Sequence, residues 1–123
     1  MLAAVFSYSC QFVKLPVDST IAREKVTGYL LVRQGRNDKS AFLERGGYTA
    51  ENPEALIAAL GELREHGDAR LVDDNQFGVY YEVIGDLGGC TGIRLRVKTV
   101  WMTEHLSGIT KFITLIPIET LAT

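Results

Sequence analysis

Cysteine is scarce in this chain, and its scarcity argues against two common classes of small domain. The 123 residues include only two cysteines, Cys10 and Cys90, which lie far apart and form no CxxC or Cys/His spacing. A disulfide scaffold needs more cysteines, and a structural zinc site needs closely spaced pairs of ligands. We therefore expect a reduced, cytoplasmic protein that holds no metal and no other cofactor.

Long hydrophobic runs are also missing. No stretch has the length and purity of a membrane-spanning helix, so we expect no membrane partner. Residues 1–13 are apolar but begin without the basic residues of a signal peptide. They are expected to form an edge strand or an N-terminal extension. A single domain over residues 14–117 and a C-terminal tail over residues 118–123 are expected to follow.

A large excess of positive charge is absent as well. The formal net charge is -2 at pH 7, which argues against a protein that coats nucleic acid nonspecifically, because such binding comes mainly from neutralised phosphates. The charges are nevertheless segregated: the first third of the chain and the segment 94–98 are basic, and residues 51–74 between them are acidic. This polarity suits a charged partner, although solvated faces of opposite sign would give the same pattern.

The spacing of apolar residues predicts short helices followed by strands. Helical spacing and capping residues place helices near residues 22–31, 38–45 and 53–66. Runs of β-forming residues bounded by glycine and asparagine predict strands over Ala69–Val72, Val79–Ile84, Arg94–Thr103 and Lys111–Ile116. Short turns between consecutive strands imply an antiparallel meander. We expect an α+β fold in which the helices pack on one face of a four-stranded sheet.

The start of the second predicted helix is a candidate phosphate site. Gly35 and Arg36 form a turn before it, and Lys39 lies in its first turn. The first N–H groups of a helix lack internal partners and carry partial positive charge, so two cations beside them could hold an anion. The plain structural alternative is a capped, solvated helix start.

The third predicted strand carries a second basic cluster. Arg94, Arg96 and Lys98 alternate with apolar residues and therefore share one face of the strand. Three cations in a row repel one another unless water or an anion lies over them, which favours a phosphate-bearing ligand. A solvated outer face with acidic cross-strand partners would satisfy them equally well.

A series of short elements, taken in order, is similar to one known family. The elements are Leu15-Pro16, Lys25–Leu31, Gly35-Arg36 with Lys39, Ala41 and Phe42, Gly47, Phe77-Gly78, Tyr81, Gly85, Val97–Trp101, Thr114 and Pro117. The series resembles the bacterial family designated domain of unknown function 6883 over about residues 14–117, through the order and spacing of many weak elements. That resemblance implies a small toxin module, of the kind found inside larger polymorphic toxins or beside an antitoxin-like protein.

The order of helices followed by a meander is also similar to the barnase, colicin and RelE-like group of ribonuclease folds, by analogy of fold alone. The resemblance implies the toxin of a bacterial toxin–antitoxin pair that cleaves RNA without a metal and binds a small antitoxin-like protein. The alternative is a non-enzymatic interaction module, or a degenerate toxin that keeps the partner interface and has lost its chemistry. The sequence leaves the oligomeric state open.

A metal-independent ribonuclease needs cations for the phosphate and groups that move protons. Arg36 can grip two phosphate oxygens as a fork, whereas Lys39 acts as a point charge. The other candidates for catalysis are Thr99, Thr114, His105 and Tyr81, and the candidates for substrate binding are Arg96, Lys98 and Trp101.

Each of these side chains also has a structural alternative. A strand threonine often fills a half-buried site, and the sole tryptophan of a small domain is often a core residue. His66 at a helix end is typical of a charge partner for the helix dipole. The general base stays open among His105, Glu82 and Glu104.

Overall fold

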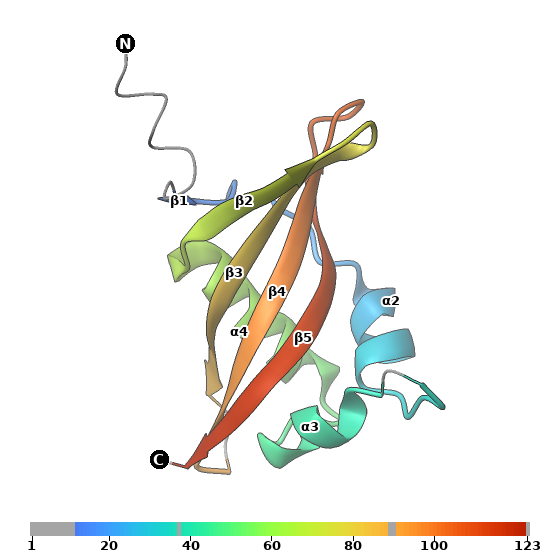
Figure 1. Cartoon of the computed structure of the whole chain (residues 1–123). Coiled ribbons are helices and arrows are strands. Elements are labelled where there is room, and N and C mark those ends of the chain that lie inside the picture. The colour runs from blue at the N-terminus through green and yellow to red at the C-terminus, as the bar shows by residue number, and fades with distance from the viewer. Residues whose placement is uncertain (1–11, 37, 89–90, 123) are drawn as a thin grey trace.

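The protein, seen here in a computed structural model, is described over residues 12–36, 38–88 and 91–122. Its centre is a five-stranded antiparallel sheet in which consecutive strands are neighbours (Figure 1). The strands are β1 (Phe12–Val13), β2 (Ala69–Asp74), β3 (Gly78–Gly88), β4 (Ile93–Glu104) and β5 (Thr110–Ala122). The helices are α2 (Arg23–Lys25), the π-helical turn η1 (Val26–Leu30), α3 (Ser40–Arg45) and α4 (Pro53–His66). The predicted α+β class, with helices followed by a meander, is confirmed.

Alternation along β4 separates two faces of the sheet, as predicted. Leu95, Val97, Thr99 and Trp101 are buried, and the alternate positions Arg94, Arg96 and Lys98 are exposed or half-buried; Met102, near the end of the strand, is buried as well. Successive strand residues point to opposite faces, so the first set meets the helices and the second set lies on the other side. We call that second side the open face.

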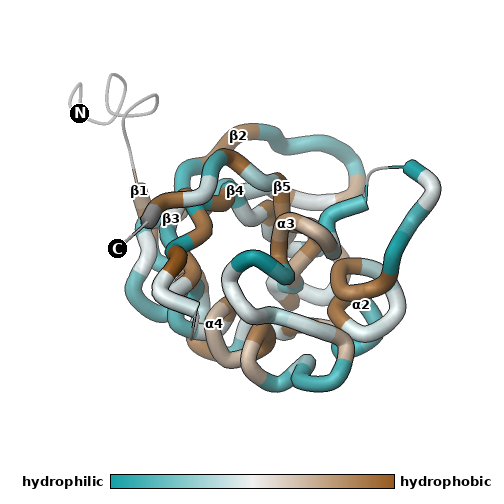
Figure 2. The backbone as a smooth tube through the Cα atoms, turned by 90° about the horizontal axis from the view of Figure 1, so that it is seen from below, coloured by the Kyte–Doolittle hydropathy of each residue, from teal (hydrophilic) through white to brown (hydrophobic). Residues whose placement is uncertain are grey.

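The core lies between the sheet and the helices. Leu56 and Leu60 of α4 and Leu30 of η1 are fully buried in it. Trp101 and Phe112 meet edge to face in the same core, with ring centroids 5.4 Å apart. Figure 2, seen from below, shows α2 and α4 on the same side of the strands. Truncating a buried leucine to alanine typically costs about 2–5 kcal/mol, so this one-sided core holds the domain together.

The segment before α2 fixes the position of the N-terminal helices. Thr20 pairs with the start of β5: its N–H donates to the Thr110 carbonyl, and the Phe112 N–H donates to the Thr20 carbonyl, each at 2.8 Å. Arg64 of α4 holds the same segment by donating to the Ser19 carbonyl at 2.9 Å. The chain therefore enters α2 and η1 directly beside the edge of β5.

The ends of the chain differ from the prediction. Residues 118–122, expected as a tail, continue β5 to Ala122 because they keep pairing with β4. Phe12 and Val13 pair with Arg70 and Ala69 as a fifth strand, so the edge-strand alternative applies to these two residues. Residues 1–11, Cys10 and Cys90 lie outside the described residues.

Two internal details also differ. The first predicted helix is α-helical only over Arg23–Lys25, and then widens into η1, where the Leu31 N–H donates to the Val26 carbonyl five residues earlier, at 3.0 Å. Gly85, which follows the predicted end of this strand at Ile84, lies inside β3 against Leu63 of α4. No described helix is long and apolar enough to cross a membrane.

Candidate functional site at the edge of β5

The start of α3 is already occupied by a carboxylate. Oδ1 of Asp38 accepts hydrogen bonds from the Ser40 hydroxyl at 2.7 Å, the Ser40 N–H at 3.1 Å and the Gln34 N–H at 3.3 Å. These bonds, led by the Ser40 hydroxyl, lower the pKa of Asp38 and keep it charged. At the backbone N–H groups of this helix start the structure favours the capped alternative, because the bound carboxylate carries the same sign of charge as a phosphate.

Lys39 turns away from the helix start and reaches β5. Its Nζ donates to Oγ1 of Thr114 at 2.9 Å and lies 5.4 Å from the centroid of the Tyr29 ring. The ammonium group is thus held by a hydroxyl and an aromatic face from two elements far apart in the sequence. Arg36 is exposed in the turn before α3. Of the predicted catalytic residues, the structure joins Lys39 directly to Thr114.

Both elements that hold Lys39 are irregular. Tyr29 belongs to the π-helical turn η1. In β5 the register changes between the pairs Trp101–Phe112 and Val100–Thr114, which leaves Ile113 as an extra, bulged residue. π-turns and β-bulges occur often at functional sites, where a bulge redirects a side chain. Here the two irregularities lie side by side and direct Tyr29 and Thr114 to the same cation.

A pocket of about 450 Å³ adjoins this cluster. It lies between the N-terminal helical segment and β5, and its lining consists of Ala22, Glu24, Lys25, Tyr29, Ile113 and Thr114. Ala22, Ile113 and the Tyr29 ring make much of the lining apolar, whereas Glu24 and Lys25 add one charge of each sign. We refer to this hollow as the η1–β5 pocket.

The basic cluster of β4 lies on the open face as predicted, but acidic side chains satisfy it. Asp86 contacts both arginines, Arg94 at 2.7 Å and Arg96 at 3.0 Å, and the hydrogen bond to Asp86 raises the pKa of Arg96. Glu119 pairs with Arg96 at 3.3 Å. Neighbouring strands thus supply the counter-charges, which favours the solvated-face alternative over a phosphate site.

Lys98 follows the same pattern. Its Nζ lies 3.4 Å from Glu82, whose carboxylate also pairs with Arg70 at 3.5 Å. The structure therefore uses Arg96 and Lys98, both predicted to bind substrate, in ion pairs across the sheet. Glu82 is held between two cations on the open face, so its carboxylate oxygens are already engaged in ion pairs.

Thr99 and Trp101 lie inside the core, where substrate cannot reach them. Both are 0% exposed. The Trp101 Nε1–H donates to Oγ1 of Thr99 at 2.9 Å, and that hydroxyl donates to the Val83 carbonyl at 3.0 Å. Their burial favours the structural alternative over contact with substrate. Tyr81 lies opposite Trp101 in register and packs against the same core.

His105 lies in the loop between β4 and β5, at the opposite end of the sheet from α3 (Figure 1). Its Nε2 lies 3.0 Å from Asp74 and 2.9 Å from the Asn75 carbonyl, which ties this loop to the β2–β3 turn. Glu104 bonds Lys111 and Ser107, and these bonds lower its pKa, Lys111 first. The fold does not bring His105 or Glu104 to Lys39.

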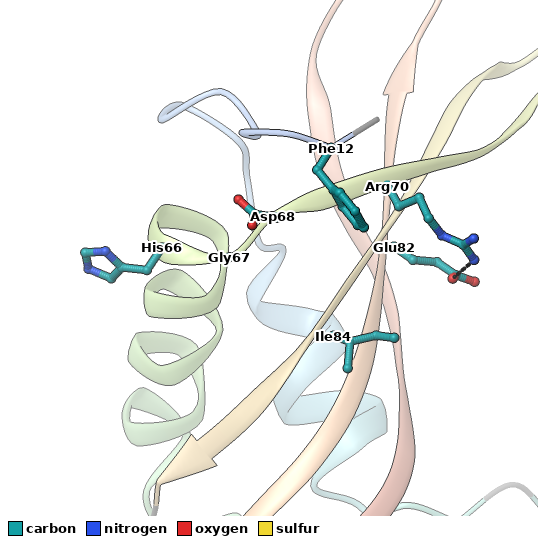
Figure 3. Close-up of a pocket in the computed structure, with 7 residues that line it drawn as sticks. All are labelled: Phe12, His66, Gly67, Asp68, Arg70, Glu82 and Ile84. Atoms are coloured by element: carbon teal, nitrogen blue, oxygen red, sulfur yellow. Dashed lines mark hydrogen bonds and ion pairs between the residues drawn. The ribbon is translucent and has the colours of Figure 1, made fainter. Parts of the chain in front are cut away.

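A second hollow, of about 590 Å³, lies where β1, β2 and the end of α4 meet. Figure 3 shows Phe12 and Ile84 lining it beside the Arg70–Glu82 ion pair, while the His66 ring points away from the other labelled side chains. His66 lies 3.4 Å from Glu62 on the exposed face of α4. Together with Glu65 these two residues bring their ligand atoms within 4.8 Å of one another, but all three are exposed. Solvated clusters of this kind are common, and we assign no metal to it.

Comparison with known proteins first defines the class of fold. One chain of a solved structure, the contact-dependent growth inhibition toxin–immunity protein complex from Klebsiella pneumoniae 342, matches this protein with a TM-score of 0.64. The two chains are 18% identical, and the match covers 81% of this chain and 100% of the other. At this identity the likeness is one of fold.

The family follows from the sequence. The family model of the domain of unknown function DUF6883 matches residues 16–119. The chain belongs to this family, and the resemblance drawn from its short motifs is confirmed. No curated protein matches the chain significantly.

Sequence reasoning missed most of the η1–β5 pocket. Tyr29 has the spacing of a core residue and, with Lys25, belongs to the Lys25–Leu31 element of the family resemblance, whereas nothing in the sequence singles out Glu24. Ile113 falls in a strand whose bulge has no obvious sequence signal. Only the three-dimensional approach of η1 to β5 brings these residues to Lys39.

Proposed function

We propose that this protein is an RNA-cleaving toxin domain that acts in the cytoplasm and needs no metal. The observation that carries the proposal is the contact of Lys39 with Thr114 and Tyr29 across a π-turn and a β-bulge. The fold shared with a chain of a toxin–immunity protein complex supports a toxin context. An antitoxin-like or immunity-type protein is the proposed partner.

The cluster suits phosphoryl transfer from a ribose 2′-hydroxyl. The 2′-oxygen attacks phosphorus, the bond to the 5′-oxygen breaks, and a 2′,3′-cyclic phosphate forms. The Lys39 ammonium stabilises the charge on the phosphorane oxygens, and the Thr114 hydroxyl orients that ammonium and can donate to the same oxygens. Arg36, exposed in the preceding turn, suits a neighbouring phosphate of a flexible strand.

Proton transfer needs one more group at this site. The Glu24 carboxylate lines the adjoining pocket and is the acidic side chain among its lining residues. In this proposal Glu24 accepts the 2′ proton, and the leaving 5′-oxygen takes a proton from Lys39 or from water. Glu24 therefore replaces His105, Glu82 and Glu104 as the candidate base.

Tightly controlled expression in a bacterium tests the proposal. Wild type is expected to stop growth and fragment cellular RNA, whereas Lys39→Met and Thr114→Val are expected to do neither. Lys14→Met is the matched control, because Lys14 pairs with Asp68 at 2.9 Å, away from the pocket. A harmless, folded wild type with intact RNA would overturn the proposal.

The open face favours a second candidate, a module that only binds a protein partner. Ile84, Ile116 and Ile118 are 58%, 39% and 47% exposed there, flanked by the ion pairs of β3, β4 and β5. An apolar patch with a charged rim is typical of a protein interface. Under this alternative the wild type leaves RNA intact, and Ile84→Asp abolishes complex formation with the immunity-type protein while Lys39→Met preserves it.

A further inference from the structure

We infer that the η1–β5 pocket binds one unstacked nucleobase of the RNA strand, next to the phosphate held at Lys39. The inference rests on the proposed function and adds a substrate-binding subsite to it. Three features of the site carry it: the size and lining of the pocket, the shared ring of Tyr29, and the charges at the rim.

The pocket has the dimensions and the surface of a small-molecule site. A volume of about 450 Å³ falls in the range of about 300–1,000 Å³ that is typical of ligand pockets. Its apolar lining comes from Ala22, Ile113 and the ring of Tyr29. Single-stranded RNA is recognised through bases that leave the stack and lie against aromatic side chains. A flat, partly apolar base fits this lining better than a hydrated sugar or a metal ion does.

Tyr29 connects the pocket to the phosphate site. Its ring lines the pocket and also lies 5.4 Å from the Lys39 ammonium. Thr114 belongs to both places as well, since it lines the pocket and accepts a hydrogen bond from Lys39 at 2.9 Å. A nucleotide whose phosphate lies at Lys39 therefore has its base beside Tyr29.

The rim supplies groups that read the edge of a base. The Glu24 carboxylate accepts hydrogen bonds from amino and ring N–H groups, and the Lys25 ammonium donates to carbonyl oxygens and ring nitrogens. Every nucleobase carries groups of these kinds. Glu24 thus accepts a hydrogen bond from the base edge or takes the ribose 2′ proton. Both groups belong to one bound nucleotide.

Binding of small ligands to the purified full chain tests the subsite without requiring cleavage. The four nucleoside 3′-monophosphates, ribose 5-phosphate and inorganic phosphate would be titrated by NMR or calorimetry. Because base stacking on an aromatic side chain adds to the binding affinity, at least one nucleotide should bind about tenfold more tightly than ribose 5-phosphate. Equal affinity for ribose 5-phosphate and all four nucleotides would overturn the inference.

A pocket-filling variant localises the effect. Ala22→Trp places a large side chain in the pocket and is expected to remove the advantage of the nucleotide while leaving the affinity for inorganic phosphate unchanged. Ala58→Trp, on the exposed side of α4, is the matched control and should keep that advantage. If both variants bind nucleotides like wild type, the base binds elsewhere and the inference fails.

A substrate change separates this inference from the proposed function and needs no variant. An RNA oligonucleotide with an abasic residue at the cleaved position should be cut at least about tenfold more slowly than the intact oligonucleotide. Equal cleavage of both would overturn the base subsite and leave the ribonuclease proposal standing. Tight nucleotide binding without cleavage of any RNA would overturn the ribonuclease proposal and leave the base subsite standing.

Discussion

Thr99 and Thr114 lie on neighbouring strands, but their hydroxyls face different surroundings. Thr99 is fully buried and bonds Trp101 and the Val83 carbonyl. Thr114 is half-buried at the edge strand and accepts a hydrogen bond from the ammonium group of Lys39. A hydroxyl with two fixed core partners stabilises the fold, whereas one that orients an ammonium group can act on a ligand.

Thr99→Val is expected to lower stability without a direct effect on chemistry. Valine keeps the shape but leaves the buried Trp101 Nε1–H without its partner, and an unsatisfied buried donor costs about 1–3 kcal/mol. The measurement is the free energy of unfolding in urea. Thr99→Ser, which keeps the hydroxyl, is the control for the hydrogen bonds. A Thr99→Val protein as stable as wild type would contradict the bonding pattern seen here.

The lowered pKa values of three carboxylates predict how the free energy of unfolding depends on pH. Hydrogen bonds lower the pKa of Asp38 (first from Ser40), of Glu54 (from Arg23) and of Glu104 (first from Lys111). The unfolded chain therefore binds more protons than the folded chain as these groups titrate. Their stabilisation is present above the unfolded pKa values, about 3.9 for Asp38 and about 4.3 for the two glutamates, and disappears as the pH falls through the lowered folded values.

Urea denaturation between about pH 6 and pH 2 checks this dependence. The denaturation midpoint should fall on acidification below about pH 4.3. The double variant Asp38→Asn, Glu104→Gln should show a shallower fall, since amides do not titrate in this range. A pH profile identical to that of wild type would show that these two groups contribute nothing.

At the scale of elements, helices and strands with a regular spacing of apolar residues could be predicted from the sequence, whereas the irregular π-turn and β-bulge could not. The stripe Leu56, Leu60 and Leu63 after Pro53 predicted α4, and the alternation of β4 predicted which side chains are buried. The widening of η1 and the bulge at Ile113 lie where the N-terminal segment docks beside β5. Such docking depends on contacts between residues distant in the sequence, so neither the π-turn nor the bulge is marked by a local sequence pattern.

Two glycines, Gly61 within α4 and Gly67 directly after its last residue, give opposite predictions for the stability of an alanine variant. A Cβ at Gly67 would lie 2.5 Å from a Val83 methyl and 2.6 Å from the Leu63 carbonyl oxygen, so Gly67→Ala must displace α4 from β3 and destabilise the fold. At Gly61 the nearest atom is 3.8 Å away. Gly61→Ala should stabilise by about 0.5–1 kcal/mol, because glycine inside a helix costs entropy.

Thermal unfolding of the two alanine variants measures this contrast. The melting temperature is expected to fall for Gly67→Ala and to rise for Gly61→Ala, with wild type between them. Equal melting temperatures would show that the close approach of α4 to β3 is not required for stability.

At the scale of the whole molecule, strand register decides what the charges do. The sequence placed Arg94, Arg96 and Lys98 together, but their partners Asp86, Glu82 and Glu119 come from two other strands. The alternation of residues within a strand predicts the face on which each side chain lies, but it does not predict which side chains of the neighbouring strands lie beside it. The open face is therefore a mixed, ion-paired surface. Lys39, in contrast, contacts Tyr29 and Thr114, two residues that line the η1–β5 pocket.

The central claim is that RNA is cut at the cluster of Tyr29, Lys39 and Thr114. The most direct measurement is cleavage of a labelled single-stranded RNA by purified wild-type, Lys39→Met and Lys14→Met proteins, with a chelator present. The account predicts a cyclic phosphate product for wild type and Lys14→Met, and a loss of about 10²–10³ in rate for Lys39→Met. Cleavage by Lys39→Met at the wild-type rate, with all three proteins folded, would contradict it.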